Sequence, residues 1–288
     1  MADAPRQRTL AGRTQTLHGV GLHAGRPCSV ILAPGAPGAG LVFQRADEPG
    51  SPDIPANADR IVPAERCTAL RSGTAEVRTV EHLLAACVLA GLDNALLLVE
   101  GGEVPAADGS AAPFLELIEH VGLVEQDAPR RARRLAQTVA LEDPAGWTIR
   151  AESAPGPAWS FRFRGGGRLD GTEAAFDPAR DDPRLVATAR TFCYETEITA
   201  LRARGLGQGG TAENVLVLRA DGSAVNGERM AGEAVRHKLL DLIGDCALAG
   251  PAPMARVTAS GSGHAAHARF VRALGPHLVR EEAPRAHA

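Results

Sequence analysis

The cysteines of this chain do not form a pattern that could define its fold. There are five among 288 residues, an odd number, and no two of them form a CxxC pair. A disulfide-stabilised fold and a cysteine zinc site both require paired or closely spaced cysteines. The thiols are therefore interpreted as reduced and mostly buried. They are Cys28, Cys67, Cys87, Cys193 and Cys246.

Long apolar runs are also missing. The longest strongly apolar stretch is 83–92, much shorter than the roughly 20 residues of a membrane-spanning helix. The polar segment MADAPRQRTLAGR has none of the apolar character of a signal peptide. We therefore expect a cytoplasmic protein without a transmembrane segment.

The chain has no excess of charge of either sign. Its 31 lysines and arginines nearly balance its 34 aspartates and glutamates, which gives a formal net charge of -3. This balance gives no electrostatic reason to expect nucleic-acid binding. The arginines within 130–134 are interpreted as part of a solvated linker rather than a binding patch.

P-loop and serine-hydrolase motifs are absent as well. GVGLHAG does not fit GxGxxG, and neither GxxxxGK[ST] nor GxSxG occurs. Dinucleotide-binding, P-loop and nucleophile-elbow proteins are therefore not favoured.

The hydrophobic pattern predicts short strands and a few helices. In the first half, several strands precede an apolar helix over 79–92. Thr79 is the expected N-cap of this helix, and Gly91 is its expected stop. A buried strand follows over 94–100, because the run NALLLVE is almost continuously aliphatic.

The charged segment 125–134 divides the chain into two similar halves. It contains Pro129, and beyond it the succession of strands and helices partly repeats. We predict an α+β protein of two related domains, each a sheet packed with two helices. Their expected ranges are 1–127 and 135–288.

The helix predicted over 233–248 carries the first chemically informative spacing. His237 and Asp241 are four residues apart, so their side chains lie on one face, about 6 Å apart along the axis. This spacing suits two ligands of one metal ion, as in HExxH. Asp245 continues the same face one turn later. An ordinary amphipathic helix with a polar face toward solvent has the same spacing and remains an alternative.

Glu81 and His82 are unusual because they lie near the start of an otherwise apolar helix. Burying an unpaired carboxylate there would cost several kcal/mol, so we expect both side chains to face a polar site. His82 could supply a third ligand, completing a catalytic set of two histidines and one carboxylate. Glu81 would be the base beside the metal. His264, in ASGSGHAAH, is a further candidate, although a histidine bonded to solvent at a helix start fits equally well.

Five ordered motifs together resemble one known family. They are VEHLLAACVLAGLDN, DGSAAPF, ARTF, RHKLLDLIGD and SGSGH, and RTL and GVGLHAG precede them. This succession resembles the UDP-3-O-acyl-N-acetylglucosamine deacetylase family, which carries out the committed step of lipid A synthesis in Gram-negative bacteria. The resemblance extends from near the N-terminus to at least Leu274.

The resemblance implies a zinc enzyme with its active site at the interface of two α+β domains. It implies zinc ligands at His82, His237 and Asp241. It also implies that Glu81 is the general base.

The resemblance assigns a second group of residues to catalysis and substrate binding. It implies that His264 is a general acid or electrostatic stabiliser and that Asp245 orients it. It implies that Thr191 helps to bind the developing oxyanion. Phe192 and Lys238 match substrate-contacting positions.

The resemblance further implies an insert that forms an apolar passage for the acyl chain. Here the insert would be 193–210, which ends at Gly210 and is expected to be loop-like. Ile198 and Leu201 are the candidates for the passage wall, and Gly210 is a further candidate for substrate binding. A larger side chain at Ala200 is expected to fill the passage.

Two positions depart from the family pattern. Relatives usually have a histidine–proline pair after the strand that corresponds to WSFRFR, and commonly a lysine before the SGH motif. This chain has RGGGRLDG at 164–171 and glycine at Gly261. The substrate contacts that relatives make from that loop are therefore not carried over to this chain, whereas the metal site is unaffected. The loop is expected to be mobile because it is rich in glycine.

Two other interpretations compete with a zinc hydrolase. Two histidines and an aspartate also form the iron(II) triad of oxygenases, but that triad normally uses HxD on a strand-rich barrel rather than HxxxD on a helix. A catalytically weakened sugar-nucleotide-binding relative would be expected to lose Glu81 or His264, and both are present. We therefore favour a monomeric enzyme that hydrolyses the N-acetyl group of UDP-3-O-acyl-N-acetylglucosamine to UDP-3-O-acyl-glucosamine and acetate.

Overall fold

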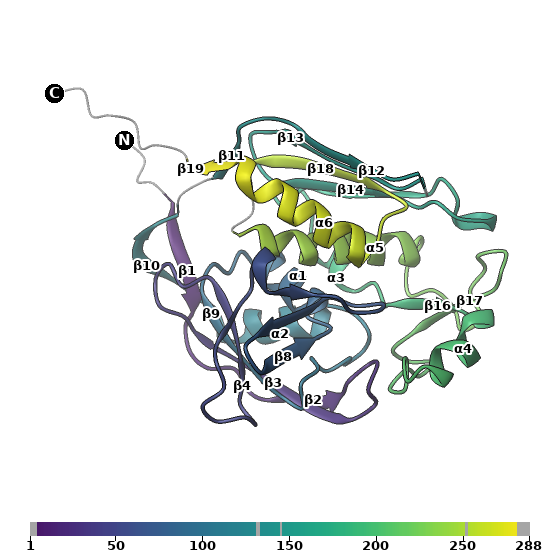
Figure 1. Ribbon diagram of the computed structural model, residues 1–288, viewed down its shortest axis with the longest axis horizontal. Coiled ribbons are helices and arrows are strands. Elements are labelled where there is room, and N and C mark those ends of the chain that lie inside the picture. Colours follow the sequence, from purple (N-terminus) through teal and green to yellow (C-terminus); the bar gives the residue numbers. More distant parts are fainter. Residues whose placement is uncertain (1–4, 131–132, 145, 251–252, 281–288) are drawn as a thin grey trace.

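The computed structural model describes residues 5–130, 133–144, 146–250 and 253–280. In these ranges, two five-stranded sheets lie on opposite sides of a layer of helices (Figure 1). This architecture confirms the predicted α+β class.

The N-terminal sheet has the strand order β2-β3-β9-β4-β5. All neighbouring strands are antiparallel except β4 and β9, which are parallel. Leu97 and Val99 of the aliphatic strand β9 are completely buried, as expected for the central strand of a covered sheet. The five strands are β2 (Leu17–Val20), β3 (Pro27–Pro34), β4 (Leu41–Arg45), β5 (Ile54–Pro55) and β9 (Ala95–Glu100).

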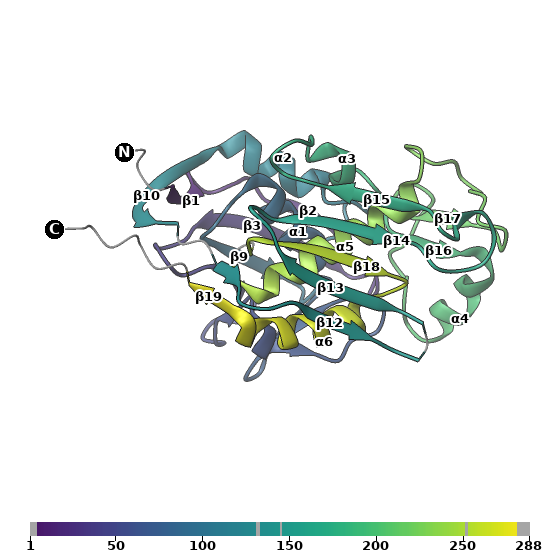
Figure 2. The same ribbon diagram turned by 90° about the horizontal axis from the view of Figure 1, so that it is seen from above.

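The C-terminal sheet repeats this topology. Its order is β12-β13-β18-β14-β15, and only β14 and β18 are parallel. Figure 2 shows these strands in this order across the near face of the molecule. The five strands are β12 (Val139–Glu142), β13 (Thr148–Ser153), β14 (Ala158–Arg162), β15 (Glu173–Phe176) and β18 (Ala255–Ser260).

Each half also contributes two helices, in the same chain order relative to its strands. The N-terminal pair is α1 (Glu81–Ala90) and α2 (Ala112–Val121), and the C-terminal pair is α5 (Glu233–Cys246) and α6 (His264–Leu274). Helices α1 and α5 pack directly against each other between the sheets (Figure 1). The two halves therefore meet through their first helices.

A close approach between α1 and α5 depends on Gly244. A Cβ atom at this position would lie 2.0 Å from the carbonyl oxygen of Glu81 and 3.2 Å from the amide nitrogen of Ala85. Such a distance is far inside van der Waals contact, so no larger residue fits without moving a helix. Gly244 thus allows the two helices to bring their polar residues together.

Each half inserts extra structure between its fourth strand and its first helix. The N-terminal insert is a small sheet, β6 (Ile61–Val62), β7 (Ala69–Ser72) and β8 (Ala75–Arg78). The C-terminal insert contains α3 (Arg184–Ala187), β16 (Phe192–Tyr194), α4 (Ile198–Ala203) and β17 (Leu216–Leu218). The expectation that 193–210 is loop-like was therefore wrong, because six of its residues form α4.

Two strand pairs flank the connection between the halves. β1 (Arg6–Leu10) pairs with β10 (Leu123–Pro129), and β11 (Arg133–Leu135) pairs with β19 (Leu278–Arg280). The expected boundary between 127 and 135 falls here, and residues 131–132 lie outside the described ranges. The domain limits therefore stay a prediction. Short 3-10 turns complete the fold: η1 (Ala58–Arg60), η2 (Gly167–Leu169), η3 (Glu195–Glu197), η4 (Ala247–Ala249) and η5 (Gly275–His277).

The ends of α1 test the expected capping residues. Gly91 ends the helix in the left-handed conformation with φ 69°, which confirms the prediction. Thr79 is not the N-cap: the cap position is Val80, and the Thr79 hydroxyl donates instead to Glu103 Oε1 over 2.9 Å. A tertiary hydrogen bond thus replaces the local cap.

No helix within the described ranges has both the length and the apolar character needed to cross a membrane.

Candidate metal centre and active site

His82, His237 and Asp241 form a tight cluster at the contact between α1 and α5. His82 belongs to the first turn of α1, and the other two lie one turn apart on α5. Asp241 Oδ1 lies 3.3 Å from His237 Nε2 and 3.7 Å from His82 Nε2. The three residues are at most 5% exposed. A polar helix face directed toward solvent is therefore excluded.

The cluster suits a bound cation. One ligand atom from each of the three residues can be chosen so that all lie within 4.8 Å of one another. Asp241 Oδ1 is buried and has no hydrogen-bond partner among the described residues, and leaving such an acceptor unpaired is costly. The lone pairs of the two imidazoles and this carboxylate match a donor set that catalytic metal sites use.

Protonation states in the cluster favour metal binding as well. Burial lowers the pKa of both histidines, that of His82 to about 3 with a contribution from His237. The neutral rings therefore keep a lone pair for a cation. The His237 Nδ1 atom is hydrogen-bonded to the carbonyl oxygen of Ala189 over 3.0 Å, which leaves Nε2 as the donor to a cation. Burial favours the neutral acid of Asp241, but the charge of Lys238 opposes it and holds the pKa of Asp241 below the usual range.

Glu81 precedes His82 on α1 and lies beside the cluster. Its Oε2 atom accepts a hydrogen bond from the backbone N–H of Thr68 over 3.0 Å, so the carboxylate has a fixed orientation. Burial raises the pKa of Glu81 to about 8, partly opposed by His264. A carboxylate with a pKa near neutrality is suited to accept a proton and to release it again.

Asp245 connects a second group of side chains. Its Oδ2 atom accepts from His264 Nδ1 over 2.9 Å and from His267 Nδ1 over 2.7 Å. Its Oδ1 atom accepts from the Thr68 hydroxyl over 2.6 Å. The far nitrogen of His267, Nε2, lies 2.9 Å from the Ser262 hydroxyl. Asp245, His264 and His267 also satisfy the spacing of a metal site, but these hydrogen bonds already use the Nδ1 atoms of both histidines.

The two histidines of this group are in different protonation states. Burial favours neutral His264, but the charges of Asp245, Asp241 and Glu81 outweigh it and raise its pKa to about 9. Burial lowers the pKa of His267 despite the same Asp245 carboxylate. A charged His264 next to a neutral His267 is consistent with one carboxylate accepting a hydrogen bond from both rings. His264 Nε2 then lies 4.0 Å from Glu81 Oε1, within the same site.

The metal-binding cluster, Glu81 and His264 line one cavity of about 520 Å³ between the two halves, and Asp245 reaches this cavity through its hydrogen bond to His264. Thr191 and Phe192 of the ARTF motif border it. Lys238 also borders it and donates to Asp241 Oδ2 over 2.8 Å. The structure therefore brings together every residue that the sequence implied for metal binding and catalysis, together with two of the implied substrate-binding residues.

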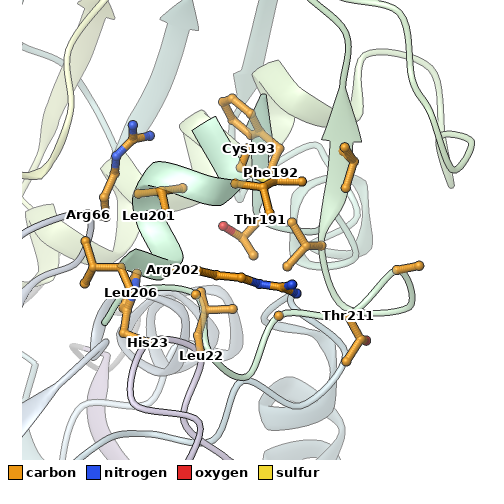
Figure 3. A pocket seen from close by; sticks show the side chains of 16 residues that line it. Leu22, His23, Arg66, Thr191, Phe192, Cys193, Leu201, Arg202, Leu206 and Thr211 are labelled. Carbon is orange, nitrogen blue, oxygen red and sulfur yellow. The ribbon is translucent and has the colours of Figure 1, made fainter. Parts of the chain in front are cut away.

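An apolar cavity of about 230 Å³ adjoins the first one. Leu22, Arg66, Thr191 and Phe192 belong to both. Figure 3 shows Leu22 and His23 approaching this cavity from the side opposite Phe192 and Cys193. The apolar cavity continues along α4, away from the metal-binding cluster.

The insert 193–210 contributes part of the wall of the apolar cavity. The implied passage residues Ile198 and Leu201 and the implied substrate-binding residue Gly210 all border it. Ala200 does not: its side chain is exposed, because α4 is a helix that turns this position away from the cavity. The expectation that Ala200 faces the passage was wrong.

Several residues of the site have no clear signal in the sequence. Thr68 lies in a loop before β7, and the Ala189 contribution is a backbone carbonyl. His267 lies three residues after His264, a spacing that places both on one helix face and could have been recognised. Trp147, which borders the larger cavity, could have been noticed as one of only two tryptophans.

Gly261, the second position that departs from the family pattern, lies against the side chain of Arg164. Gly261 has φ +63°, and a Cβ atom there would lie 3.0 Å from Cβ of Arg164. The Arg164 side chain packs over the position where relatives commonly carry a lysine. The guanidinium donates from NH1 to the carbonyl oxygen of Gly146 over 2.9 Å.

Fold and donor set together define an α+β protein with the residues of a metal-dependent hydrolase. The family model described as LpxC, UDP-3-O-acyl N-acetylglycosamine deacetylase, matches residues 7–275. A UDP-3-O-acyl-N-acetylglucosamine deacetylase of Thermosynechococcus vestitus is 42% identical over 277 residues, covering 96% of this chain and 96% of the relative. The enzyme of the same name from Brucella melitensis biotype 2 is 38% identical over 274 residues, covering 93% and 94%. The chain therefore belongs to the UDP-3-O-acyl-N-acetylglucosamine deacetylase family, which confirms the resemblance seen in its motifs.

Proposed function

We propose that this protein hydrolyses the N-acetyl group of UDP-3-O-acyl-N-acetylglucosamine, releasing acetate and UDP-3-O-acyl-glucosamine for lipid A synthesis. The observation that carries the proposal is the unpartnered Asp241 Oδ1 between two neutral histidines, with Glu81 alongside. A sugar-nucleotide-binding protein without chemistry would have no use for this buried and costly arrangement.

The proposed cofactor is one Zn²⁺ ion held by His82, His237 and Asp241. Two nitrogen donors and one oxygen donor at an otherwise open site suit catalytic zinc. A bound zinc ion would supply Lewis acidity, which polarises the acetamide carbonyl and makes water easier to deprotonate. The carbonyl of Ala189 keeps the His237 ring in the required orientation.

Glu81 is the proposed general base. Its carboxylate accepts one proton from the attacking water as the oxygen of that water bonds to the acetamide carbon. The hydrogen bond from Thr68 N holds Oε2, so that Oε1 is available for this proton. The raised pKa of Glu81 brings its proton affinity close to what catalysis at neutral pH requires.

His264 and Thr191 are the proposed partners of the oxyanion and the leaving group. The Thr191 hydroxyl donates a hydrogen bond to the carbonyl oxygen as negative charge develops there. His264, kept protonated by Asp245, stabilises the same charge or gives a proton to the nitrogen as the C–N bond breaks. The proton taken by Glu81 then passes to the leaving nitrogen, or to His264 where His264 has already protonated that nitrogen. The carboxylic acid product loses its own proton to solvent, so acetate and a free amine leave.

The apolar cavity is the proposed passage for the 3-O-acyl chain. It adjoins the catalytic cavity at Thr191 and Phe192, and Ile198, Leu201 and Gly210 lie along it. Each CH₂ group buried there would contribute about 0.8 kcal/mol. The expected domains, 1–127 and 135–288, would then share one substrate across their interface, in a monomeric cytoplasmic enzyme.

Mass spectrometry of purified full-length protein with substrates of graded acyl length tests this proposal. Loss of the acetyl group is expected, with a rate that depends on chain length. An intact acetamide after prolonged incubation with zinc-supplied protein, together with measurable binding of the substrate, would instead favour a binding protein.

A further inference from the structure

His267 is a buried titratable side chain that the proposed chemistry does not use. The residue lies fully buried in the first turn of α6 and is not one of the described residues that line the catalytic cavity. Its ring is nevertheless hydrogen-bonded to Asp245, the carboxylate that also accepts from His264. Burying a polar ring costs free energy unless its nitrogens find partners. The partners of the two ring nitrogens therefore indicate what this side chain does.

The two partners of His267 fix one tautomer of its ring. A carboxylate only accepts hydrogen bonds, so the 2.7 Å contact with Asp245 Oδ2 requires a proton on Nδ1 of His267. Burial lowers the pKa of His267, so the ring is neutral and Nε2 keeps a lone pair. The buried Ser262 hydroxyl, 2.9 Å away, donates to this lone pair. The ring therefore cannot flip without breaking both hydrogen bonds.

The donors that hold the Asp245 carboxylate differ in how far they are enclosed. Oδ1 accepts from the Thr68 hydroxyl, and Oδ2 accepts from both histidine rings. The His264 side chain borders the catalytic cavity and is 15% exposed, whereas the His267 side chain is 0% exposed. His267 is thus the enclosed donor to Oδ2, and His264 is the donor that reaches the cavity.

The spacing of the two histidines lets one carboxylate oxygen meet both. They are three residues apart on one face of α6, and their ring centroids lie 6.0 Å apart. Helix α6 packs against α5, which carries Asp245 (Figure 1). A rotation of the Asp245 carboxylate would move Oδ2 away from both rings at once. The hydrogen bond from His267 therefore resists the same rotation that would release His264.

We propose that His267 is a positioning residue that holds the Asp245 carboxylate, so that Asp245 keeps the His264 ring directed into the catalytic cavity. This inference rests on the proposed function, in which His264 acts on the oxyanion or on the leaving nitrogen. His267 itself exchanges no proton with the substrate. Because its effect is on the group that meets the developing charge, its loss should lower kcat rather than raise KM.

Leucine and asparagine at position 267 separate positioning from packing. Leucine is of similar size but has no donor, whereas the side-chain amide of asparagine can donate from near the place of Nδ1. His267→Leu is expected to lower kcat by about 10–100-fold, the usual effect of losing a hydrogen-bond partner just outside a metal site, with KM and zinc content unchanged. His267→Asn should restore most of kcat. Steady-state kinetics and metal analysis on the same full-length preparations measure both.

Phe270→Leu is the matched control for packing on α6. Phe270 is fully buried on the same helix, one turn from His267, and is not one of the described residues that line the catalytic cavity. This variant should lower the Tm and leave kcat at the wild-type level. If kcat followed Tm across all the variants, or if asparagine restored no activity, His267 would be a packing residue and the proposal would be overturned.

Nuclear magnetic resonance of protein labelled at histidine gives a readout that does not need turnover. The ring signal that disappears in His267→Asn belongs to His267. In the wild type it should show a proton on Nδ1 and none on Nε2. A proton on Nε2 alone would leave no donor for Asp245 and would refute the positioning. The Nδ1 proton of His264 should broaden in His267→Leu, because the carboxylate that holds it becomes free to rotate, and should stay sharp in His267→Asn.

The outcomes separate this inference from the proposed function. If the wild type releases acetate and His267→Leu turns over at the same rate, the positioning role is refuted and the reaction stands. If the wild type releases no acetate, the proposed reaction fails. The resonance measurements then still decide the positioning: a His264 signal that broadens only in His267→Leu supports it, and one that is the same in all variants contradicts it.

Discussion

The two halves of the molecule have the same framework but contribute differently to the site. Both have one strand order, a single parallel pair and two helices. The N-terminal half contributes Glu81 and His82 from the first turn of α1. The C-terminal half contributes two of the three proposed ligands and Asp245 from α5, and His264 and His267 from α6. In the proposed mechanism, the N-terminal half supplies the general base, and the C-terminal half supplies two of the three metal ligands.

The inserts differ even more than the helices. They occupy the same place in the chain order, between the fourth strand and the first helix. The N-terminal insert is a small sheet that supplies Thr68 to both Glu81 and Asp245. The C-terminal insert forms the wall of an apolar cavity. The two inserts therefore occupy equivalent places in the repeated framework but differ in use. One provides a hydrogen-bond donor to the catalytic carboxylates, and the other provides part of an apolar cavity wall.

Removing a ligand from the C-terminal half should have the largest effect. His237→Ala is expected to lose bound zinc and to reduce deacetylation to background, because two of the three proposed ligands lie on α5. Metal analysis by atomic emission and a turnover assay would measure both. The control is His120→Ala, since His120 lies in the last turn of α2. Undiminished zinc in His237→Ala would refute the site.

Removing the base from the N-terminal half should have a different signature. Glu81→Gln is expected to keep zinc and fold while kcat falls by about 10²–10⁴-fold, the usual contribution of a general base. Steady-state kinetics and metal content on the same preparation provide the measurement. An unchanged kcat would remove Glu81 from the mechanism.

The contact between the halves can be broken at Gly244. Gly244→Ala places a methyl group 2.0 Å from the Glu81 carbonyl oxygen, so the helices must separate. We expect a loss of stability of about 1–3 kcal/mol, the usual cost of overpacking, and a clear drop in activity. Chemical denaturation would measure the loss of stability, and a turnover assay would measure the drop in activity. Gly275→Ala is the matched control, since a Cβ there would meet nothing within 4 Å; equal losses in both variants would exclude this role for the close contact.

The ion pair behind the ARTF motif gives a pH-dependent test. Burial favours neutral Glu233, but hydrogen bonds from Arg190 hold its pKa below the usual range. A lowered folded-state pKa stabilises the protein above the ordinary glutamate pKa, and this stabilisation is lost as pH falls through the folded value.

Glu233→Gln should therefore destabilise the protein most at neutral pH, by about 3–5 kcal/mol, because the buried Arg190 loses its counter-charge. The difference from wild type should shrink as the pH falls below about 4, the ordinary glutamate range. Urea unfolding at several pH values would show this. Glu152→Gln, in an exposed pair with Arg150, is the control and should have little effect. A pH-independent difference would contradict the account.

The smallest and most selective effect is expected in the C-terminal insert. Leu201→Trp should narrow the apolar cavity and lower kcat/KM for long acyl chains more than for short ones. Ala200→Trp, whose side chain would face solvent, is the matched control. Competition assays with two chain lengths provide the measurement. Equal losses for both lengths would place the acyl chain elsewhere.

The sequence was most informative where spacing alone determines geometry. The four-residue spacing of His237 and Asp241 predicted their shared face, and the polar pair Glu81–His82 in an apolar helix predicted a buried polar site. The strand over 94–100 and the stop at Gly91 were predicted from local composition for the same reason. These features depend on neighbours in the chain.

Features that depend on distant segments could not be predicted. Thr79 donates to Glu103 rather than capping its own helix, and the Ala189 carbonyl reaches His237 from a different element. The glycine-rich context of 193–210 concealed α4, which is exposed or only half-buried along its length and has no clear hydrophobic periodicity. The contact of Gly244 with the Glu81 carbonyl likewise joins residues that are far apart in the chain, so the sequence alone did not predict it.

Zinc titration of chelated full-length protein tests the central claim most directly. Acetate release from UDP-3-O-acyl-N-acetylglucosamine should be absent without metal, should rise with added zinc, and should saturate at one ion per chain. Full turnover by the metal-free protein, or no turnover at saturating zinc, would contradict a single metal site built from both halves.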